Sequence, residues 1–500
     1  MFKFQITSDQ RACLLLLGCL ALSQANLANP SWYDPPQDWE AETHSSDQKS
    51  SNIYSSTSSS ETTSSSNSQE NESFHKDLFP LDSTDYIGFI CATLGLILAS
   101  GGGIGGGGML VPIYVLVMGF TPKHAIPLSN ITVFGGSISN FILNRVKRHP
   151  EANRPLMDMD LILVMQPMTI AGALLGSFAN KLLPEIILTI CLVVLLTYTT
   201  KQTLEKGFVV FAKETKDKEK KESELSRIAR ESVVNVEKEG LLTEDDELER
   251  QSLPTLPRRE LNEIYDEEST IPWWKLYLLW AMFAVVIAVN ILKGGGGFPS
   301  PIGITCGTTG YWFSTAAMFL WILAISYYVR SYLVEMTAKK LALGYKYATG
   351  DIAWDESATV VYPLICIGAG VCAGLFGIGG GIVQVPLMLH LGVQPKVASA
   401  TSATMIMYTS ATALTSFYVF GLLIMDYALP CFVIGMIVTA VGQIGTNELI
   451  KMLGRDSIII FSVAAVVGVS AVLMGTHSAM SLASSDVDLS IGSFCQEGER

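Results

Sequence analysis

The chain has 500 residues, of which 49% are hydrophobic and only 16% are charged, and its formal net charge is −13. Soluble proteins usually carry about a quarter charged residues. Here the charges gather in blocks between long apolar runs, at 26–85, 145–160, 201–270 and 330–356. This distribution excludes an ordinary soluble domain and predicts a polytopic membrane protein. The acidic balance gives no indication of nucleic acid as a partner.

The first 85 residues contain two segments of different character. In residues 1–25, basic residues precede the apolar stretch CLLLLGCLAL and small residues follow it, which predicts a signal peptide, with a short extra membrane anchor as the alternative. Residues 26–85 are serine-rich and acidic, so we expect a disordered tail in the lumen or outside the cell. Within this tail, Asn71 begins an Asn-Glu-Ser glycosylation sequence.

Twelve apolar segments follow, and each is expected to be helical. They are 86–100, 109–119, 126–143, 160–179, 185–200, 273–292, 311–329, 358–376, 382–392, 398–420, 427–446 and 457–475. Segments 109–119 and 382–392 are too short to cross a bilayer, because a helix of that length spans about 16 Å of the roughly 30 Å hydrocarbon layer. Each follows a glycine cluster, so each is predicted to be half of a broken or re-entrant hairpin.

The distribution of lysine and arginine predicts the orientation. These residues concentrate in the loops 145–155, 330–356 and 447–457, whereas the opposing loops hold at most one each. The positive-inside rule places the basic loops in the cytosol, in agreement with the outside N-terminus that a signal peptide requires. The mixed-charge segment 201–272 falls on the cytosolic side as a helical linker.

The glycine motif occurs twice, as GIGGGGMLVP at 103–112 and as GIGGGIVQVP at 377–386. Further matches follow both copies, so the chain contains two related halves, the first starting outside and the second in the cytosol. Inverted repeats with broken helices at corresponding positions point to the substrate site of a transporter. The predicted order after the tail is a first membrane repeat (86–200), a cytosolic linker (201–272), an extra transmembrane pair (273–329), a cytosolic loop (330–357), a second membrane repeat (358–475) and a C-terminal tail (476–500).

A glycine turn followed by a helix N-terminus favours anion binding, because unpaired amide groups and the helix dipole converge there. Irregular backbone at membrane depth is tolerated only where it is buried in protein or lines a cavity. We therefore predict an anion site near the bilayer midplane, formed by Gly105, Gly106, Gly107, Gly379, Gly380 and Gly381. The alternative is that the glycines only permit tight helix packing. A dinucleotide site is excluded, since a membrane run and not a soluble strand precedes the glycines.

The motifs resemble a known family. The paired G-I-G-G-G-x-x-x-V-P motifs, the P-K-x-A and T-S-A-T segments within 395–404 and the turn at 421–426 are similar to those of the TauE/SafE sulfite exporter family, over about 86–200 and 358–475. The signal peptide, long middle loop and extra hydrophobic pair resemble its eukaryotic branch. The resemblance implies transport of sulfite, sulfonates or related organosulfur anions, which suits the anion site. The first half departs from the pattern, with I-P-L-S-N where the second has S-A-T-S-A.

Polar side chains within the membrane segments are candidates for substrate contact. Besides the six glycines, the expected contacts are Ser129, Asn130, Thr132, Gln384, Ser399, Thr401 and Ser402. Their hydroxyl and amide groups can donate to sulfonate oxygens. The alternatives are hydrogen bonds from serine and threonine to their own helix carbonyls, and an interhelical hydrogen bond for the glutamine.

Charged residues near the hairpins suggest further roles. Lys123 and Lys396 occupy matched positions on opposite faces, where they are expected to attract anions at the two entrances or to snorkel to the interface. His124 and His390 are candidates for proton coupling, against a hydrogen-bonded structural role.

Carboxylates are confined to the ends of the membrane segments. Asp160 and Asp426 begin matched segments and are expected to cap their helices. Because no carboxylate lies deep in an apolar run, a proton relay is not favoured, and a channel-like or facilitated mode stays open. Cys306 and Cys495 both fall on the lumenal side, where a disulfide between them is allowed.

The sequence as a whole predicts an all-α, polytopic helical membrane protein with two inverted-topology repeats that transports an anion by alternating access. The family resemblance implies that this anion is an oxidised sulfur compound. It is expected not to be an enzyme, because it shows no Ser/His or paired-Asp arrangement. No spacing suggests a metal site, and no cofactor is expected. The expected partners are a small sulfur anion and the lipid bilayer of the secretory pathway or plasma membrane. The alternative is a membrane scaffold or signalling protein that keeps the fold and acts through residues 201–272.

Overall fold

A computed structural model describes residues 78–100, 106–231, 255–348, 350–453 and 457–483. The predicted signal peptide and Asn71 lie outside these residues, as do Gly105 and Cys495. Cys306 is disulfide-bonded, and its predicted partner lies outside the described residues. In the described part of the chain the regular secondary structure is entirely helical.

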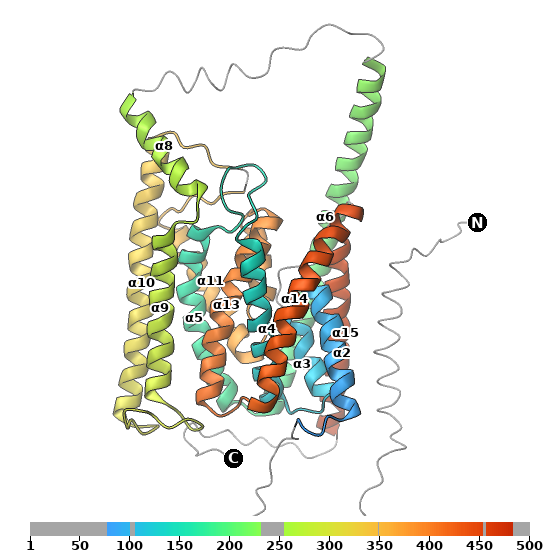
Figure 1. Cartoon of the computed structure of the whole chain (residues 1–500), viewed down its shortest axis with the longest axis vertical. Coiled ribbons are helices and arrows are strands. Elements are labelled where there is room, and N and C mark those ends of the chain that lie inside the picture. The colour runs from blue at the N-terminus through green and yellow to red at the C-terminus, as the bar shows by residue number, and fades with distance from the viewer. Residues whose placement is uncertain (1–77, 101–105, 232–254, 349, 454–456, 484–500) are drawn as a thin grey trace, which may run out of the picture. The chain divides into compact units, whose positions relative to one another are not determined.

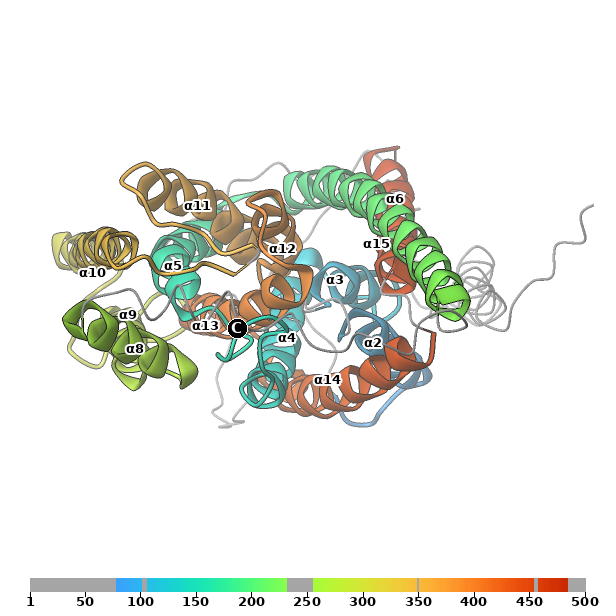
Figure 2. The ribbon, with the colours of Figure 1, turned by 90° about the horizontal axis from the view of Figure 1, so that it is seen from above.

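Each of the twelve predicted segments corresponds to a helix (Figures 1 and 2). The helices are α2 (Ser83–Ser100), α3 (Gly107–Leu116), α4 (Pro122–Asn144), α5 (Met159–Leu182), α6 (Glu185–Glu231), α8 (Thr255–Ser269), α9 (Trp273–Lys293), α10 (Thr309–Ala342), α11 (Ala358–Phe376), α12 (Gly381–His390), α13 (Pro395–Val419), α14 (Met425–Leu453) and α15 (Ser457–Ala483). Helix α8 has no counterpart among the predicted segments, and α10 continues into the predicted loop 330–357. Within the described residues, eight helices are long and apolar enough to cross a membrane. The prediction of a polytopic helical membrane protein is confirmed.

The two short segments remain short. Helices α3 and α12 have 10 residues each, which gives each a length of about 15 Å. Neither can cross the hydrocarbon layer alone. The half-length segments predicted after the two glycine clusters are therefore half-length helices in the structure.

Local chemistry explains several helix starts, and one prediction is wrong. Helices α4 and α13 begin with Pro122 and Pro395, whose fixed φ and missing N–H suit the first helical position. Helix α5 is capped by Asp158, whose carboxylate accepts hydrogen bonds from the N–H groups of Asp160 and Leu161 at 3.0 Å. Asp160 is therefore not the cap, because it already lies inside the helix, where it pairs with a lysine. Its counterpart Asp426 likewise lies within the first turn of α14.

Helices α4, α5 and α13 are the most deeply embedded. In Figure 2, α13 lies between α4 and α5, and both pairs are in contact. Helices α5 and α11 approach within backbone contact, because a Cβ on Gly370 or Gly374 would lie 2.1 Å from a carbonyl oxygen of α5. Small residues permit such close crossings where lipid gives helices no hydrophobic drive to associate.

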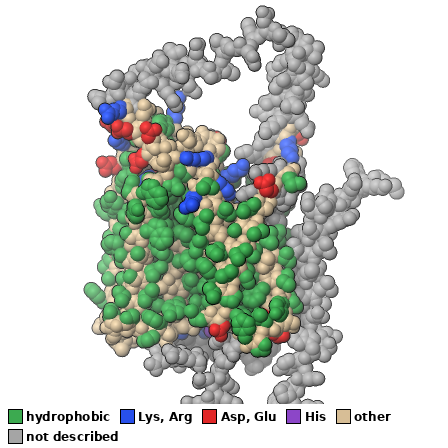
Figure 3. All heavy atoms as spheres, in the orientation of Figure 1, with side chains coloured by type: hydrophobic (Ala, Val, Ile, Leu, Met, Phe, Trp, Pro, Cys, Tyr) green, Lys and Arg blue, Asp and Glu red, His purple; other side chains and the backbone are tan. Residues whose placement is uncertain are grey.

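The outer helices present apolar side chains. Trp273, Leu320 and Leu429 are each at least 65% exposed, and hydrophobic side chains cover most of the face shown in Figure 3. Charged side chains gather toward the end of the helices near α8. A large exposed apolar surface bounded by charge is typical of contact with a lipid bilayer.

Candidate functional site

Both short helices begin at a glycine in the left-handed conformation. Gly106 has φ 71° before α3, and Gly380 has φ 83° before α12. Side chains other than glycine rarely adopt this conformation. Neither helix receives a side-chain hydrogen bond at its N-cap, so the positive end of each dipole is left without a side-chain cap.

The two glycine turns lie against each other. A Cβ on Gly107 would be 2.4 Å from the Cα of Ile378 and 2.9 Å from the carbonyl oxygen of Gly377. Ser129 joins them, because its Oγ donates to the carbonyl oxygen of Gly377 at 3.0 Å and lies 3.4 Å from that of Gly107. The structure thus brings the two copies of the motif together, although 274 positions separate them along the chain.

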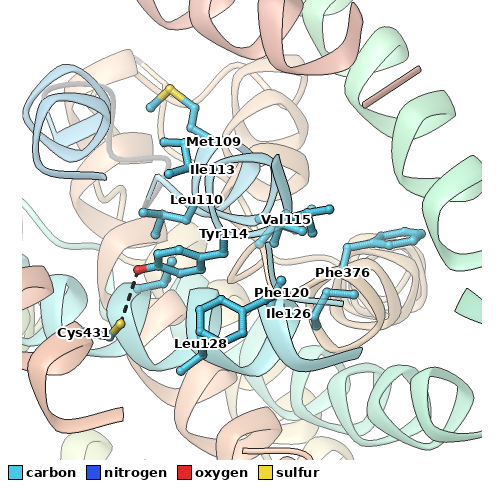
Figure 4. Packing of buried hydrophobic residues seen from close by; sticks show 14 of the residues in the cluster. Met109, Leu110, Ile113, Tyr114, Val115, Phe120, Ile126, Leu128, Phe376 and Cys431 are labelled. Carbon is cyan, nitrogen blue, oxygen red and sulfur yellow. Dashed lines mark hydrogen bonds between the residues drawn. The ribbon is translucent and has the colours of Figure 1, made fainter. Parts of the chain in front are cut away.

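Buried hydrophobic residues fix the position of α3. Met109, Leu110 and Ile113 pack in the cluster of Figure 4, and Tyr114 points toward Cys431 of α14. The Tyr114 hydroxyl lies 3.6 Å from the Cys431 sulfur and 2.8 Å from the Thr132 hydroxyl on α4. The first half-helix is therefore held by both α4 and α14.

Two buried amides, those of Asn130 and Gln384, have polar atoms without a hydrogen-bond partner among the described residues. Asn130 is fully buried, and neither its Oδ1 nor its Nδ2 has a hydrogen-bond partner among the described residues. Gln384 is also fully buried; its Oε1 accepts from Ser402 at 3.4 Å, whereas its Nε2 has no partner in the described part of the chain. The Gln384 Nε2 lies 3.3 Å from the place of a Cβ on Gly380. Since a buried unpaired polar group costs about 1–3 kcal/mol, these amides need a further explanation.

The predicted hydroxyl contacts are mostly engaged. Thr132 donates to the carbonyl oxygen of Leu128 in its own helix at 2.7 Å. Thr401 accepts from the backbone N–H of Asp158 at 3.1 Å. Ser399 is half-buried. The hydroxyls of Thr132 and Thr401 therefore act first as links within or between helices.

The remaining predicted glycines lie in the second turn and the start of α12. Gly379 has φ 68°, and a Cβ there would meet Val133 of α4 and Ile406 of α13. Gly381 is the first residue of α12. Helices α4 and α13 therefore both pack against the second turn.

The charged candidates lie at the ends of the helices. Lys123 is half-buried near the start of α4, whereas Lys396 is exposed near the start of α13. The Nδ1 of His124 lies 3.0 Å from the carbonyl oxygen of Leu422, so this ring links α4 to the turn after α13. The side chain of His390 lies outside the described residues.

Sequence reasoning missed a charged cluster at the N-terminal end of α5. Two small cavities, about 50 Å³ and 30 Å³, lie there, and both are lined by Arg154, Asp158 and Asp160. The available signal was a second carboxylate, Asp158, two positions before Asp160. In the described part of the chain, no group of three or more His, Cys, Asp or Glu side chains is placed to hold a metal ion.

Comparison with known proteins gives a consistent result. The family model described as "Sulfite exporter TauE/SafE" matches residues 87–474. The chain is 30% identical over 393 residues to "Sulfite exporter TauE/SafE family protein 3" of Arabidopsis thaliana, covering 78% of this chain and 77% of that protein. It is 28% identical over 414 residues to family protein 2 of the same plant, covering 81% and 86%. No solved structure gives a significant match.

Proposed function

The chain belongs to the TauE/SafE sulfite exporter family and is a multi-pass membrane transporter, not an enzyme, and we propose that it carries a small oxidised sulfur anion bound between its two glycine turns. The relatives are named as sulfite exporters, and we extend the candidate substrates from sulfite to sulfonates and related organosulfur anions, which carry the same oxidised sulfur group. The proposed site lies near the bilayer midplane, where the half-helices α3 and α12 begin.

The unpaired amides of Asn130 and Gln384 carry this proposal. Both are buried. Gln384 lies beside Gly380, and Asn130 follows Ser129, which donates to the second turn. A sulfonate or sulfite offers three oxygens that accept hydrogen bonds. Neutral amide donors and two helix dipoles together suit an anion better than a cation. A bound anion would offset the cost of burying the amide donors, since hydrogen bonds to charged groups are worth about 1.5–3 kcal/mol.

The packing supports two related halves. In the order of the two halves, α2 corresponds to α11, α4 to α13 and α5 to α14. The contact of α5 with α11 corresponds to that of α14 with α2, and the contact of α5 with α13 corresponds to that of α14 with α4. Each half-helix also contacts the long helix after it, α3 with α4 and α12 with α13. Such matched neighbours are what an inverted repeat requires.

The closeness of the turns implies movement during transport. The backbones of Gly107 and Ile378 are already in contact, so a sulfonate fits between the turns only when they separate. We propose alternating access in which each half-helix moves with the long helix that it contacts. In the proposed orientation, the N-terminal tail lies outside or in the lumen and residues 201–272 lie in the cytosol.

Flux through the purified protein in liposomes tests the site. Gln384→Met removes the unpaired donor at similar side-chain volume, and weakened binding of roughly 10- to 100-fold is expected for radiolabelled sulfite and methanesulfonate. Gln443→Met is the matched control, because Gln443 is also buried but donates to Asn144, the last residue of α4. Asn144 lies about 21 Å along that helix from Asn130.

The outcomes separate the candidates. A loss of affinity in Gln384→Met, with Gln443→Met unchanged, supports the proposed site. Equal affinities in both variants and the wild type refute it. A wild-type protein that moves neither anion favours a scaffold that retains the transporter fold.

A further inference from the structure

A cluster of seven charged side chains lies at the N-terminal end of α5, outside the glycine turns. We call it the α5 charge cluster; its members are Arg154, Asp158, Asp160, Glu268, Lys275, Lys340 and Asp351. They come from the loop before α5, from α5 itself, from α8, α9 and α10, and from the loop after α10. Four helices and two loops therefore converge on one point.

Most members of the cluster form ion pairs. Arg154 pairs with Asp351. Lys275 lies 2.5 Å from Asp160, and Lys340 lies 2.7 Å from Glu268. Lys340 also reaches Asp160 at 3.9 Å.

Asp158 is the exception. Its Oδ1 accepts hydrogen bonds from two backbone N–H groups of α5, and no lysine or arginine of the described residues pairs with it. The cluster contains three cations and four carboxylates, so one negative charge is left in excess. A single proton would neutralise the whole cluster.

The surroundings of Asp158 make it the carboxylate of the cluster that binds this proton. Burial raises the pKa of Asp158, the charge of Asp160 raises it further, and Arg154 offsets only part of the effect. Asp158 lines both small cavities, of about 50 Å³ and 30 Å³. Each exceeds the roughly 10–15 Å³ that one water needs, so water can bring a proton to it.

The other titratable groups that face Asp158 are less suited to exchange a proton. His149 accepts at Nδ1 from the N–H groups of Glu151 and Ala152. Burial and Arg154 lower the pKa of His149, so it stays neutral. Burial, and for Tyr345 also its hydrogen bond to Glu268, raises the pKa of Tyr345 and Tyr347, so both phenols keep their protons.

Asp158 is also connected to the proposed anion site. Its backbone N–H donates to Thr401 of α13, and the Thr404 hydroxyl lies 2.9 Å from the sulfur of Met157. Ser402, which follows Thr401 in α13, donates to Gln384 of α12. A change in charge at Asp158 therefore acts on the helix that contacts the second glycine turn.

We propose that Asp158 is the proton-binding site that couples anion transport to protons, an inference that rests on the proposed transport function. The excess negative charge repels an approaching anion, and protonation removes that repulsion. Binding of the proton therefore raises the affinity for the anion, and binding of the anion raises the affinity for the proton. This coupling is what symport requires. With a monovalent sulfonate and one proton, the step carries no net charge.

Methanesulfonate uptake by the full-length protein in liposomes tests the proposal, because a sulfonate stays ionised over the working pH range. A pH gradient is expected to drive accumulation in the wild type. Asp158→Asn keeps the helix cap, since Asn caps as well as Asp, and should lose accumulation while retaining exchange of labelled for unlabelled methanesulfonate. Asp355→Asn is the control: Asp355 also accepts a backbone N–H, from Ala358, but lies outside the cluster, and it should accumulate normally.

Thermal unfolding against pH gives a readout that does not need transport. Because the folded pKa of Asp158 is raised, stability is highest when the group is protonated and falls as pH rises from about 3.9 through the folded pKa. This decrease in stability with rising pH should disappear in Asp158→Asn and persist in Asp355→Asn. If Asp158→Asn does not fold, both measurements are repeated on Asp158→Ser, because serine also caps helices well.

Each outcome decides something. Gradient-driven accumulation that persists in Asp158→Asn overturns the proposal, as does accumulation that follows a sodium gradient in the wild type. An unchanged pH profile of unfolding in Asp158→Asn also overturns it. If the wild type moves no anion while that profile changes, the proposed function fails but titration of Asp158 stands.

Discussion

Substituting Gly107 by alanine probes the contact between the two glycine turns. The added Cβ would lie 2.4 Å from the Cα of Ile378 and 2.8 Å from its carbonyl carbon. Non-bonded carbon atoms prefer separations of about 3.5–4.0 Å, so the turns would have to separate by about 1.1–1.6 Å. Backbone lies on both sides of the contact, so no flexible side chain can absorb the shift.

The cost follows from two contributions. Overpacking a well-packed site costs about 1–3 kcal/mol. A separation of more than 1 Å would also lengthen the 3.0 Å hydrogen bond between Ser129 and Gly377 beyond useful range, which adds about 1 kcal/mol. Gly107→Ala is therefore expected to lower the free energy of unfolding by about 2–4 kcal/mol.

Gly368 provides a matched control on α11. It lies inside a helix, and a Cβ there would meet no atom within 4 Å. Gly368→Ala should therefore stabilise the protein by up to about 1 kcal/mol through helix propensity alone.

The assay is detergent-induced unfolding of the purified protein, followed by circular dichroism, with methanesulfonate flux measured in parallel. The expected result is opposite signs of the stability change in the two variants and reduced flux in Gly107→Ala. If Gly107→Ala unfolds at the wild-type midpoint and transports normally, the two turns are not in backbone contact, and the proposed site loses its basis.

Three further changes test other contacts. Ser129→Ala removes the hydroxyl that joins the turns and should cost about 1–2 kcal/mol, measured by the same unfolding titration. Lys275→Met leaves Asp160 with one long contact and should cost about 3–5 kcal/mol, whereas the double variant with Asp160→Asn should recover most of that loss; equal stability of single and double variants would contradict the ion pair. Lys123→Gln should slow anion uptake at low salt and leave it unchanged at high salt, if Lys123 attracts anions at one entrance; a salt-independent effect would exclude this role.

The sequence predicted the membrane helices well because the bilayer restricts their length and composition. The apolar segments 273–292 and 358–376 correspond to α9 and α11 within one residue at each end. The glycine clusters marked where α3 and α12 begin, since glycine is the residue that the left-handed turn requires. The duplicated motif also indicated that the two turns belong to one site, which the structure places in contact.

The candidate site was predicted less completely. Asn130 and Gln384 were singled out as possible donors, but their lack of partners depends on what surrounds them in the fold. The engaged hydroxyls show the same limit: the sequence could not predict that Thr401 would accept from the backbone of Asp158.

Long-range pairing was decided only by tertiary structure. Lys275 and Asp160 are 115 positions apart, and Ser129 and Gly377 are 248 apart. A local pattern contains no information on which side chains meet at such separations, so the sequence assigned the cap of α5 to Asp160 and overlooked Asp158. The amino-acid order alone determined where the apolar helices lie and where two of them are broken, because hydropathy and backbone freedom are local properties. Which charges are neutralised, and which one is left in excess, depended on how those helices pack, because electrostatic pairing requires proximity in space.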